Sequence, residues 1–256
     1  MWFNSSSSSL KGYGTAAGVP VATWASGTSF PSAVNGVTGF GLQNAAMVAA
    51  GPIATSESFT YDGTSWTDQP AMNTASPPTA RYYPGGFGTT AAGVVAGGEP
   101  LQAFTESWDG SSWTEVANLN SGRYGLNSAG TSTDGLVFAG SPEPAGVTLT
   151  EIWNGSAWTE VGDLNTARMQ PGGSGTSTGA AIAFGGLNHA TYHDLTEDWN
   201  GASWSEVADM NTARFAHGAA GSATSALAYQ GSIPGGNTQA VEEWSQAQTV
   251  RSVDTD

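Results

Sequence analysis

The sequence predicts an all-β protein built from five copies of one four-stranded unit, and three observations support this. Only 11% of the 256 residues are charged, whereas 36 are glycine and 10 are tryptophan, which favours turns and strands over helices. A tryptophan recurs at positions 24, 66, 113, 158 and 204, in steps of 42, 47, 45 and 46 residues. An Asp-Gly or Asn-Gly pair precedes it in the last four copies, which is a strong hairpin signal.

The repeated stretch is Trp-Asp-Gly-Ser-Ser-Trp-Thr-Glu at residues 108–115, with edited copies that begin at Tyr61, Trp153 and Trp199. We expect it to form the third and fourth strands of each unit, joined by a type I′ turn. In the unit at residues 168–206, the first strand is expected at 172–177 and the second at 180–184. The third and fourth are expected at 195–199 and 204–207. Small residues in the first strand suit the crowded axis of a propeller, and the period also favours a propeller or a solenoid.

The tryptophans predict how the repeats form a ring. The first aromatic position of the motif is filled at Tyr61, Trp108, Trp153, Trp199 and Trp244, and the second at Trp24, Trp66, Trp113, Trp158 and Trp204. Trp24 has no partner before it and Trp244 has none after it. We therefore expect a five-bladed β-propeller in which strands at about 20–26 and about 240–246 share one blade, because this removes exposed sheet edges. Core packing between blades explains the tryptophans better than sugar stacking does.

The flanking segments lie outside the repeats. We expect residues 1–15 to form an N-terminal hairpin or docking segment, 16–248 the propeller and 249–256 a C-terminal tail. The first residues lack the basic and apolar regions of a secretory signal peptide, and no apolar run is long enough to span a membrane.

Charge and cysteine content exclude several classes of function. The formal net charge is -15, which opposes binding to nucleic acid. There is no cysteine, so disulfides, thiolate metal sites and cysteine nucleophiles are excluded.

An arginine recurs just before each new unit, at Arg81, Arg123, Arg168 and Arg214. A ring of four arginines could bind an anion. We favour a structural role, because acidic residues recur one strand away. One set is Asp68, Glu115, Glu160 and Glu206, and the other is Glu106, Glu151, Glu197 and Glu242. An arginine fork that bridges carboxylates or loop carbonyls explains the pattern.

The order Gly-Gly, aromatic, Trp and then Arg resembles the kelch repeat of β-propellers over residues 20–245. It departs in having Trp where kelch repeats usually have Tyr, and in units shorter than about 50 residues. The recurring sequence motif Thr-Glu-x-Trp-Asn-Gly-x-x-Trp-x-Glu-Val, followed by Asn-Thr-Ala-Arg, resembles the repeats of kelch-like arrays in bacteriophage structural proteins. The opening Trp-Phe-Asn-Ser and Leu-Lys-Gly-Tyr resemble a hairpin of phage fibre proteins.

One cluster of residues could carry metal or acid–base chemistry. His189, His193 and Asp194 have metal-like spacing, but no further ligand lies near in sequence, so we expect solvated loop residues and no metal or cofactor. His217 is expected to pack at the start of an inner strand. The copper-radical oxidases on kelch propellers need a cysteine, which this chain lacks.

The loops between second and third strands differ in length and chemistry, and in a propeller they emerge on one face. Variable loops on a rigid scaffold often bind partners, although drift in unconstrained connectors explains the variation equally well. The candidate binding residues are Glu99, Gln102, Phe104, Glu143, His189, Tyr192, His193 and Asn237.

The resemblance implies a non-enzymatic bacteriophage virion protein, as a fibre, tail or capsid-decorating propeller. It would be made in the host cytoplasm and reside in the extracellular particle. Its expected partners are other virion proteins, bound through the termini, host-surface glycans and copies of itself, and we expect no membrane insertion. Two alternatives stay open: a free-standing propeller lectin, and a hydrolase or lyase that uses the loop at residues 189–194.

Overall fold

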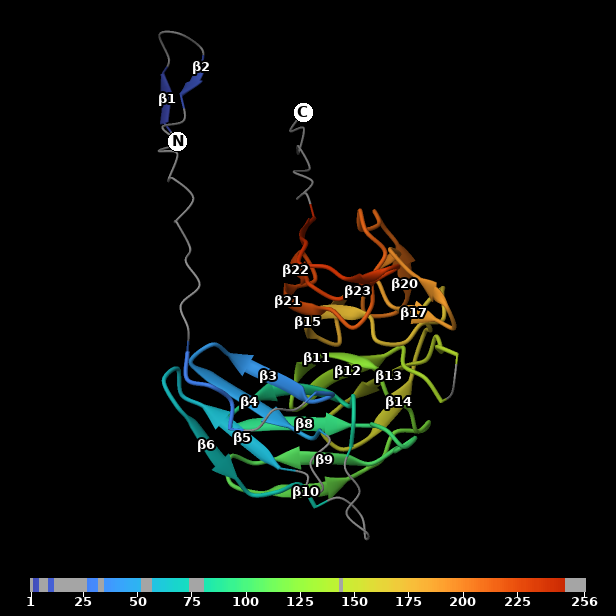
Figure 1. Cartoon of the computed structure of the whole chain (residues 1–256). Coiled ribbons are helices and arrows are strands. Elements are labelled where there is room, and N and C mark those ends of the chain that lie inside the picture. The colour runs from blue at the N-terminus through green and yellow to red at the C-terminus, as the bar shows by residue number, and fades with distance from the viewer. Residues whose placement is uncertain are drawn as a thin grey trace.

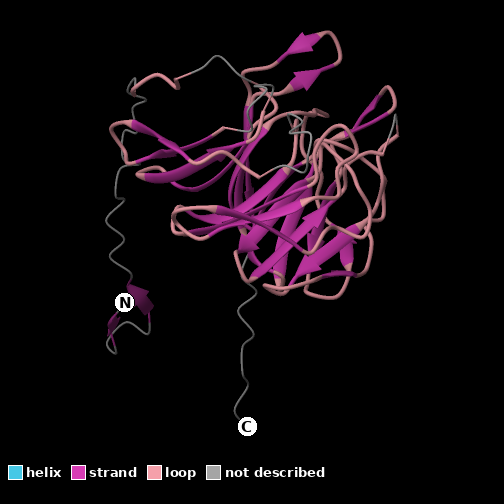
Figure 2. Cartoon of the chain, turned by 90° about the horizontal axis from the view of Figure 1, so that it is seen from below, coloured by secondary structure: helices cyan, strands magenta, loops and turns pink. Residues whose placement is uncertain are grey.

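The computed structural model describes residues 2–4, 9–11, 27–31, 35–51, 57–73, 81–142 and 145–246. These residues form antiparallel sheets, five of which are arranged as the blades of a β-propeller (Figure 1). The predicted all-β fold class is confirmed, and Figure 2 draws strands and loops without a helix in the described part of the chain. Within that part, no helix could cross a lipid bilayer.

Four blades have four strands each in chain order from the axis outward. Blade 1 contains β3 (Thr38–Leu42), β4 (Ala45–Ala49), β5 (Ser58–Tyr61) and β6 (Trp66–Gln69). Blade 2 contains β7 (Gly85–Thr89), β8 (Ala92–Ala96), β9 (Thr105–Trp108) and β10 (Trp113–Val116). Blade 3 contains β11 (Asn127–Thr131), β12 (Asp134–Phe138), β13 (Thr150–Trp153) and β14 (Trp158–Glu160). Blade 4 contains β15 (Gly172–Ser177), β16 (Ala180–Phe184), β19 (Thr196–Trp199) and β20 (Trp204–Glu206).

Blade 5 has three strands in the described part of the chain, which are β21 (Gly218–Ser222), β22 (Ser225–Tyr229) and β25 (Val241–Ser245). The strand expected at about 20–26 lies outside the described residues. Two short hairpins that the sequence did not predict lie in the variable loops of blades 4 and 5. They are β17 (Leu187–Asn188) with β18 (Thr191–Tyr192), and β23 (Ser232–Ile233) with β24 (Gly236–Asn237). Near the N-terminus, β1 (Trp2–Asn4) pairs with β2 (Ser9–Lys11).

Glycines in the inner two strands let neighbouring blades approach closely. A Cβ on Gly135 of blade 3 would lie 2.2 Å from the ring of Phe87 in blade 2. A Cβ on Gly173 of blade 4 would likewise lie 2.4 Å from the ring of Phe138 in blade 3. The aromatic ring of one blade therefore fills the space that the next blade leaves empty, as a crowded axis requires.

The turn between the third and fourth strands differs from the predicted type I′ turn. Tyr61 pairs with Trp66, so four residues separate the two strands, and Gly63 has a positive φ of 96° whereas Asp62 does not. The Asp62 carboxylate caps the turn, because its Oδ1 accepts the N–H groups of Thr64 and Ser65 at 2.8 and 2.7 Å. Asp109, Asn154 and Asn200 make the same bonds in the next three blades. The type I′ prediction was wrong because the side chain closes the turn itself.

The tryptophan pairs join neighbouring blades, as predicted. The indole N–H of Trp113 in blade 2 donates to Ser58 Oγ in blade 1 over 3.1 Å. The equivalent Trp158 and Trp204 donate to Thr105 and Thr150 of the preceding blade, over 3.0 and 2.9 Å. These three indoles are 3–7% exposed and belong to the apolar clusters between blades. Each therefore adds apolar burial and a satisfied hydrogen bond at a blade interface.

The recurring arginines are buried in ion pairs with the third strand of the blade that they precede. The pairs are Arg81–Glu106, Arg123–Glu151, Arg168–Glu197 and Arg214–Glu242, and each arginine is at most 1% exposed. The other acidic set, on the fourth strands, is exposed. The second carboxylate oxygen of each glutamate accepts the backbone N–H of an asparagine in the connector between blades, at Asn73, Asn120, Asn165 and Asn211. The glutamate thus holds the connector at two points.

The arginine backbone makes the link to the preceding blade. The carbonyl of Arg81 accepts the N–H of Gly51 over 2.8 Å, and those of Arg123, Arg168 and Arg214 accept the N–H of Gly98, Gly140 and Gly186 over 2.8–3.0 Å. These glycines have φ between 103° and 123°, a conformation that disfavours other residues. This geometry explains the recurring small-residue pair that ends in glycine.

The variant Arg168→Met is expected to lower the free energy of unfolding by about 3–5 kcal/mol, because it leaves Glu197 buried without its cation. Chemical denaturation followed by tryptophan fluorescence measures the loss. Glu206→Gln is the matched control, since this carboxylate is exposed and should change stability by less than about 0.5 kcal/mol. An Arg168→Met protein as stable as the parent would contradict the structural role of the ion pair.

Candidate functional site

The variable loops and the connectors before the inner strands meet at one end of the blades, which we call the loop face. Short antiparallel bridges join the two sets of segments there. The bridged pairs are Tyr82 with Glu99, Tyr124 with Ser141, Met169 with Leu187 and Phe215 with Ser232. The loop face is therefore tied to the connectors by backbone pairing in blades 2 to 5.

Five residues with left-handed backbone conformation surround the axis on the loop face, each two positions before an inner strand. They are Gly36, Tyr83, Gly125, Gln170 and Ala216, with φ between 49° and 66°. The N–H of each of the last four donates to the carbonyl of the preceding member, over 2.6–3.1 Å. A chain of backbone hydrogen bonds thus runs from blade 5 to blade 1 around the axis. Sequence analysis missed this feature, because tyrosine, glutamine and alanine do not favour positive φ.

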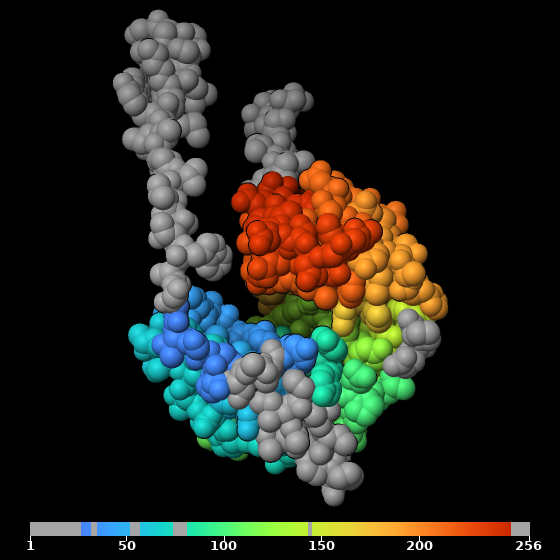
Figure 3. All heavy atoms as spheres, in the orientation of Figure 1, coloured from blue at the N-terminus to red at the C-terminus, as the bar shows by residue number. Residues whose placement is uncertain are grey.

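A cavity of about 430 Å³ follows the axis between the inner strands of all five blades. Figure 3 shows the molecule hollowed between the first blade, in blue, and the last blade, in red. The lining of the axial cavity combines glycines and apolar residues with polar side chains, and His217 is the one histidine among them, without any acidic residue, lysine or arginine. The polar side chains are those of Thr38, Asn127, Ser128, His217 and Tyr229. The Ser128 hydroxyl in this lining is already paired with Gly86, since it accepts the Gly86 N–H and donates to the Gly86 carbonyl. The Asn127 amide in the lining is likewise engaged, since its Nδ2 donates to the Pro171 carbonyl over 2.9 Å.

Three predicted binding residues fasten the loops to the arginine connectors. The Phe104 carbonyl accepts from Arg81 Nη1 at 2.9 Å and from the N–H of Gly97 at 3.0 Å. The carbonyls of Gln102 and His193 accept the backbone N–H of the next arginine, at 3.3 and 3.0 Å. Their backbones therefore serve the scaffold, which limits their freedom to rearrange around a partner.

The other predicted residues differ in exposure. His189 lies at the β17–β18 turn and Asn237 lies in β24, and both are exposed. Tyr192 packs edge-on against Phe215, with ring centroids 5.2 Å apart. Glu99 is partly buried, and its backbone pairs with Tyr82. Glu143 lies outside the described residues.

The hairpin β23–β24 carries a second accessible hollow, of about 380 Å³. It is lined by Ala216 of the connector and by residues of the variable loop, which are Gln230, Gly231, Ser232, Asn237, Thr238 and Gln239. Among the predicted binding residues, Asn237 is both exposed to solvent and part of the lining of a hollow. Gly235 and Gly236 next to it have open space where a side chain would stand.

The histidine loop shows no metal-site geometry. No group of three or more His, Cys, Asp or Glu side chains in the described residues could hold a metal ion. His193 Nε2 is buried without a hydrogen-bond partner. Burial, and then the charge of Arg168, lower the pKa of His193, while Asp194 opposes the shift.

His217 is a packing residue that sits where Leu126 sits two blades earlier. Both follow an arginine by three positions, and both fill space over a glycine of the preceding blade, Gly172 for His217 and Gly85 for Leu126. Neither ring nitrogen of His217 has a hydrogen-bond partner. Burial, and then the charge of Arg214, lower its pKa from 6.5 to about 4. The folded state therefore favours the neutral imidazole.

No protein-family model matches the chain, and no curated protein sequence matches it significantly.

His217→Leu is expected to flatten the pH dependence of stability between about pH 6.5 and 4. The folded-state pKa lies below the unfolded value, so the neutral histidine contributes fully above pH 6.5 and its contribution is lost as pH falls toward 4. The shift corresponds to about 3 kcal/mol at most. Denaturation midpoints across this pH range measure how steeply stability changes with pH. Part of this pH dependence will remain in the variant, because the pKa of His193 is also lowered. The control His189→Leu changes an exposed residue and should leave the slope unchanged; an equally steep slope in His217→Leu would contradict the assignment.

Proposed function

We propose that this chain is a non-catalytic structural component of a bacteriophage particle, built on a kelch-like propeller. It docks to other particle proteins through the segments that flank the propeller and presents its loop face to the host surface. The observation that carries the proposal is the separation of two faces, one with variable loops and one where the chain leaves the last blade.

The direction of β25 defines that separation. The strand begins after the loop that contains β23 and β24, so it runs away from the loop face. Immediately after it, the N–H of Gln246 donates over 2.9 Å to the carbonyl of Thr224, in the turn between β21 and β22. The chain therefore leaves blade 5 at the end opposite to the variable loops. A particle protein needs this polarity, with one end for attachment and the other for contact.

The repeated charged residues support a scaffold role in place of catalysis. Each recurring arginine is buried and paired with a glutamate that also holds the connector. These groups are engaged within the fold, and the exposed loop residues, such as His189 and Asn237, lie on separate blades. The sequence resemblance to kelch-like phage proteins is the reason for placing this scaffold in a bacteriophage particle.

A glycan-binding propeller is the second candidate, favoured by a hollow of about 350 Å³ between blades 1 and 2. Tyr61 and Trp108 line it together with polar side chains of Asn44, Asp62 and Gln69. An aromatic ring among hydroxyl, amide and carboxylate groups suits a sugar. However, Trp108 is 2% exposed, so Tyr61 alone offers an accessible ring. We therefore rank this function below the particle role.

Fractionation of particles from the organism that makes this protein tests the proposal. We expect an antibody against the chain to find it in the particle band of a density gradient, in fixed ratio to the major coat protein. Deleting residues 247–256 should release it from particles, whereas Asn237→Ser on the loop face should leave incorporation unchanged. Chain found free of particles would contradict the proposal, and retention of that free chain on glycan columns would favour the lectin.

A further inference from the structure

The end of the propeller opposite the loop face, which we call the turn face, carries the hollow of about 350 Å³ between blades 1 and 2. Turns between first and second strands and between third and fourth strands form this face. Asn44 and Thr90 of the hollow stand in turns of the first kind, and Asp62 and Gly110 in turns of the second. The chain also leaves blade 5 at this end, so the assignment of a partner to the hollow rests on the proposed particle role.

Three residues that line the hollow depart from the repeat. Tyr61 stands where the other motifs have tryptophan, Gln69 where blades 2 to 4 have valine, and Asn44 where blade 2 has alanine. Val116 and Val161, at the position of Gln69, pack against the apolar clusters between their blades. Blade 1 instead brings two amides and a phenol ring to its interface with blade 2. Because these departures meet at one hollow, they change what this interface can bind.

The free polar groups of the hollow are mainly hydrogen-bond acceptors. The Asp62 Oδ1 atom accepts the N–H groups of Thr64 and Ser65 and the Thr64 hydroxyl, whereas Oδ2 accepts the Ser65 hydroxyl alone among the described residues, at 3.1 Å. These bonds, that from the Ser65 N–H most of all, lower the pKa of Asp62, so the carboxylate is ionised at neutral pH. Gln69 Nε2 donates to Thr60 Oγ1 over 2.9 Å, and no described residue donates to its Oε1. A negative charge and an amide oxygen therefore remain for a donor.

The described part of the propeller has no exposed lysine or arginine to fill this hollow. Its four arginines are buried, and each is paired with a glutamate. Residues 27–246 contain no lysine, and the formal net charge of the whole chain is -15. A cationic side chain of another protein therefore meets an attractive field and no competing cation of the propeller itself.

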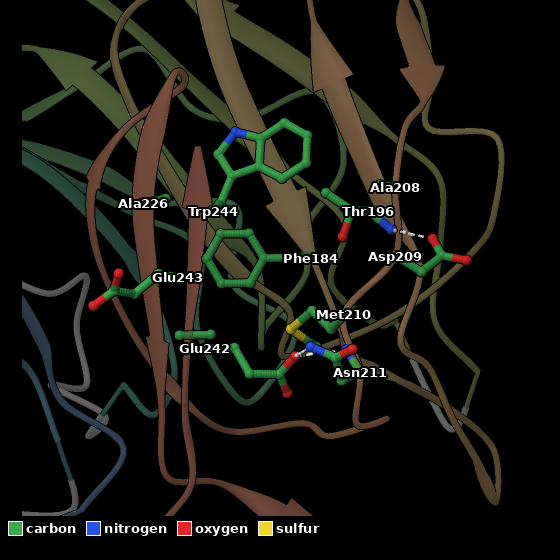
Figure 4. A pocket seen from close by; sticks show the side chains of 11 residues that line it. Phe184, Thr196, Ala208, Asp209, Met210, Asn211, Ala226, Glu242, Glu243 and Trp244 are labelled. Carbon is green, nitrogen blue, oxygen red and sulfur yellow. Dashed lines mark hydrogen bonds between the residues drawn. The ribbon is translucent and has the colours of Figure 1, made fainter. Parts of the chain in front are cut away.

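The pocket between blades 4 and 5 is also lined by acidic residues, which are Asp209, Glu242 and Glu243. Glu242 is paired with Arg214, and Asp209 Oδ1 accepts the Thr196 N–H over 3.0 Å (Figure 4). In Figure 4 the Glu243 carboxylate points away from the centre of the pocket. This pocket therefore offers less to an incoming cation than the hollow beside Asp62 does.

We propose that the hollow between blades 1 and 2 binds an arginine side chain of a neighbouring particle protein. Asp62 pairs with the guanidinium, while Tyr61 and Gln69 contact the rest of the side chain. A guanidinium has five N–H donors and no acceptor, which matches a hollow in which acceptors predominate. Its charge is also attracted to the face of a tyrosine ring. A neutral sugar leaves the charge of Asp62 unpaired, so the arginine is the better occupant.

Binding of N-acetyl-arginine methylamide to the intact chain tests the site. We expect saturable shifts of the amide resonances of Asn44, Thr90 and Gly110 in NMR spectra. Asp62→Asn should weaken binding about two- to fivefold, as the loss of an exposed ion pair does. The variant keeps the turn, because Asn154 makes the same backbone bonds in blade 3. The uncharged analogue N-acetyl-citrulline methylamide should bind parent and variant equally.

Asp109→Asn is the matched control. It removes the same charge from the equivalent turn of blade 2, and its side chain does not line the hollow, so the affinity should stay unchanged. Equal affinities of parent and Asp62→Asn, or an equal loss in both variants, would overturn the proposal. Shifts of the same amides by methyl glycosides in place of the arginine probe would overturn it in favour of a sugar. Tighter probe binding by Arg251→Gln would overturn it in favour of the chain's own tail.

Particle assembly separates this inference from the proposed function. Asp62→Asn should be released from isolated particles at a lower salt concentration than the parent, whereas Asp109→Asn should be released with the parent. Release of Asp62→Asn together with the parent would overturn the arginine site and leave the particle role standing. Absence of the parent chain from particles would contradict the particle role and, with it, the partner named for this hollow, even if the probe binds.

Discussion

The buried arginine of each connector is the interaction on which the rest of the propeller depends. Its guanidinium pairs with a glutamate on the third strand of its own blade, and its carbonyl accepts an N–H from the preceding blade. Each arginine thus fixes the connector that leads into its own blade and also links that connector to the preceding blade. Burying such an ion pair removes two charges from water, and the hydrogen bond that the connector asparagine donates to the glutamate offsets part of this cost, which explains why the asparagine recurs with the pair.

The residues that hold the blades together are therefore distinct from the exposed residues of the variable loops. Tryptophans, arginines and glycines are engaged between blades, so their recurrence reflects the requirements of packing. The loops share only their backbone attachments, as Phe104 and His193 show, and their exposed side chains are free to differ. Substitutions at such exposed loop side chains are therefore expected to change stability little.

The sequence predicts the repeated strands well because alternation, glycine positions and paired tryptophans recur in every unit. The predicted inner strands of blade 4 match β15 and β16. The choice between two sets of carboxylates as arginine partners needed the structure, since both sets lie one strand away. The left-handed conformation of Tyr83 and Gln170 was not predictable, because the surrounding backbone bonds impose it against residue preference. For the candidate binding residues, the sequence indicated the variable loops, but the exposure of Asn237 and the engagement of the Phe104 backbone depend on the fold.

Native-state hydrogen exchange tests most directly whether the connectors hold the blades together. The amides of Gly98, Gly140 and Gly186 donate to arginine carbonyls, and those of Gly125 and Gln170 bond around the axis. If these links support the fold, the five amides will exchange as slowly as those in the second strands, through global unfolding alone. Exchange at the rate of exposed loops, while strand amides stay protected, would show that each blade is stable by itself and would contradict this account.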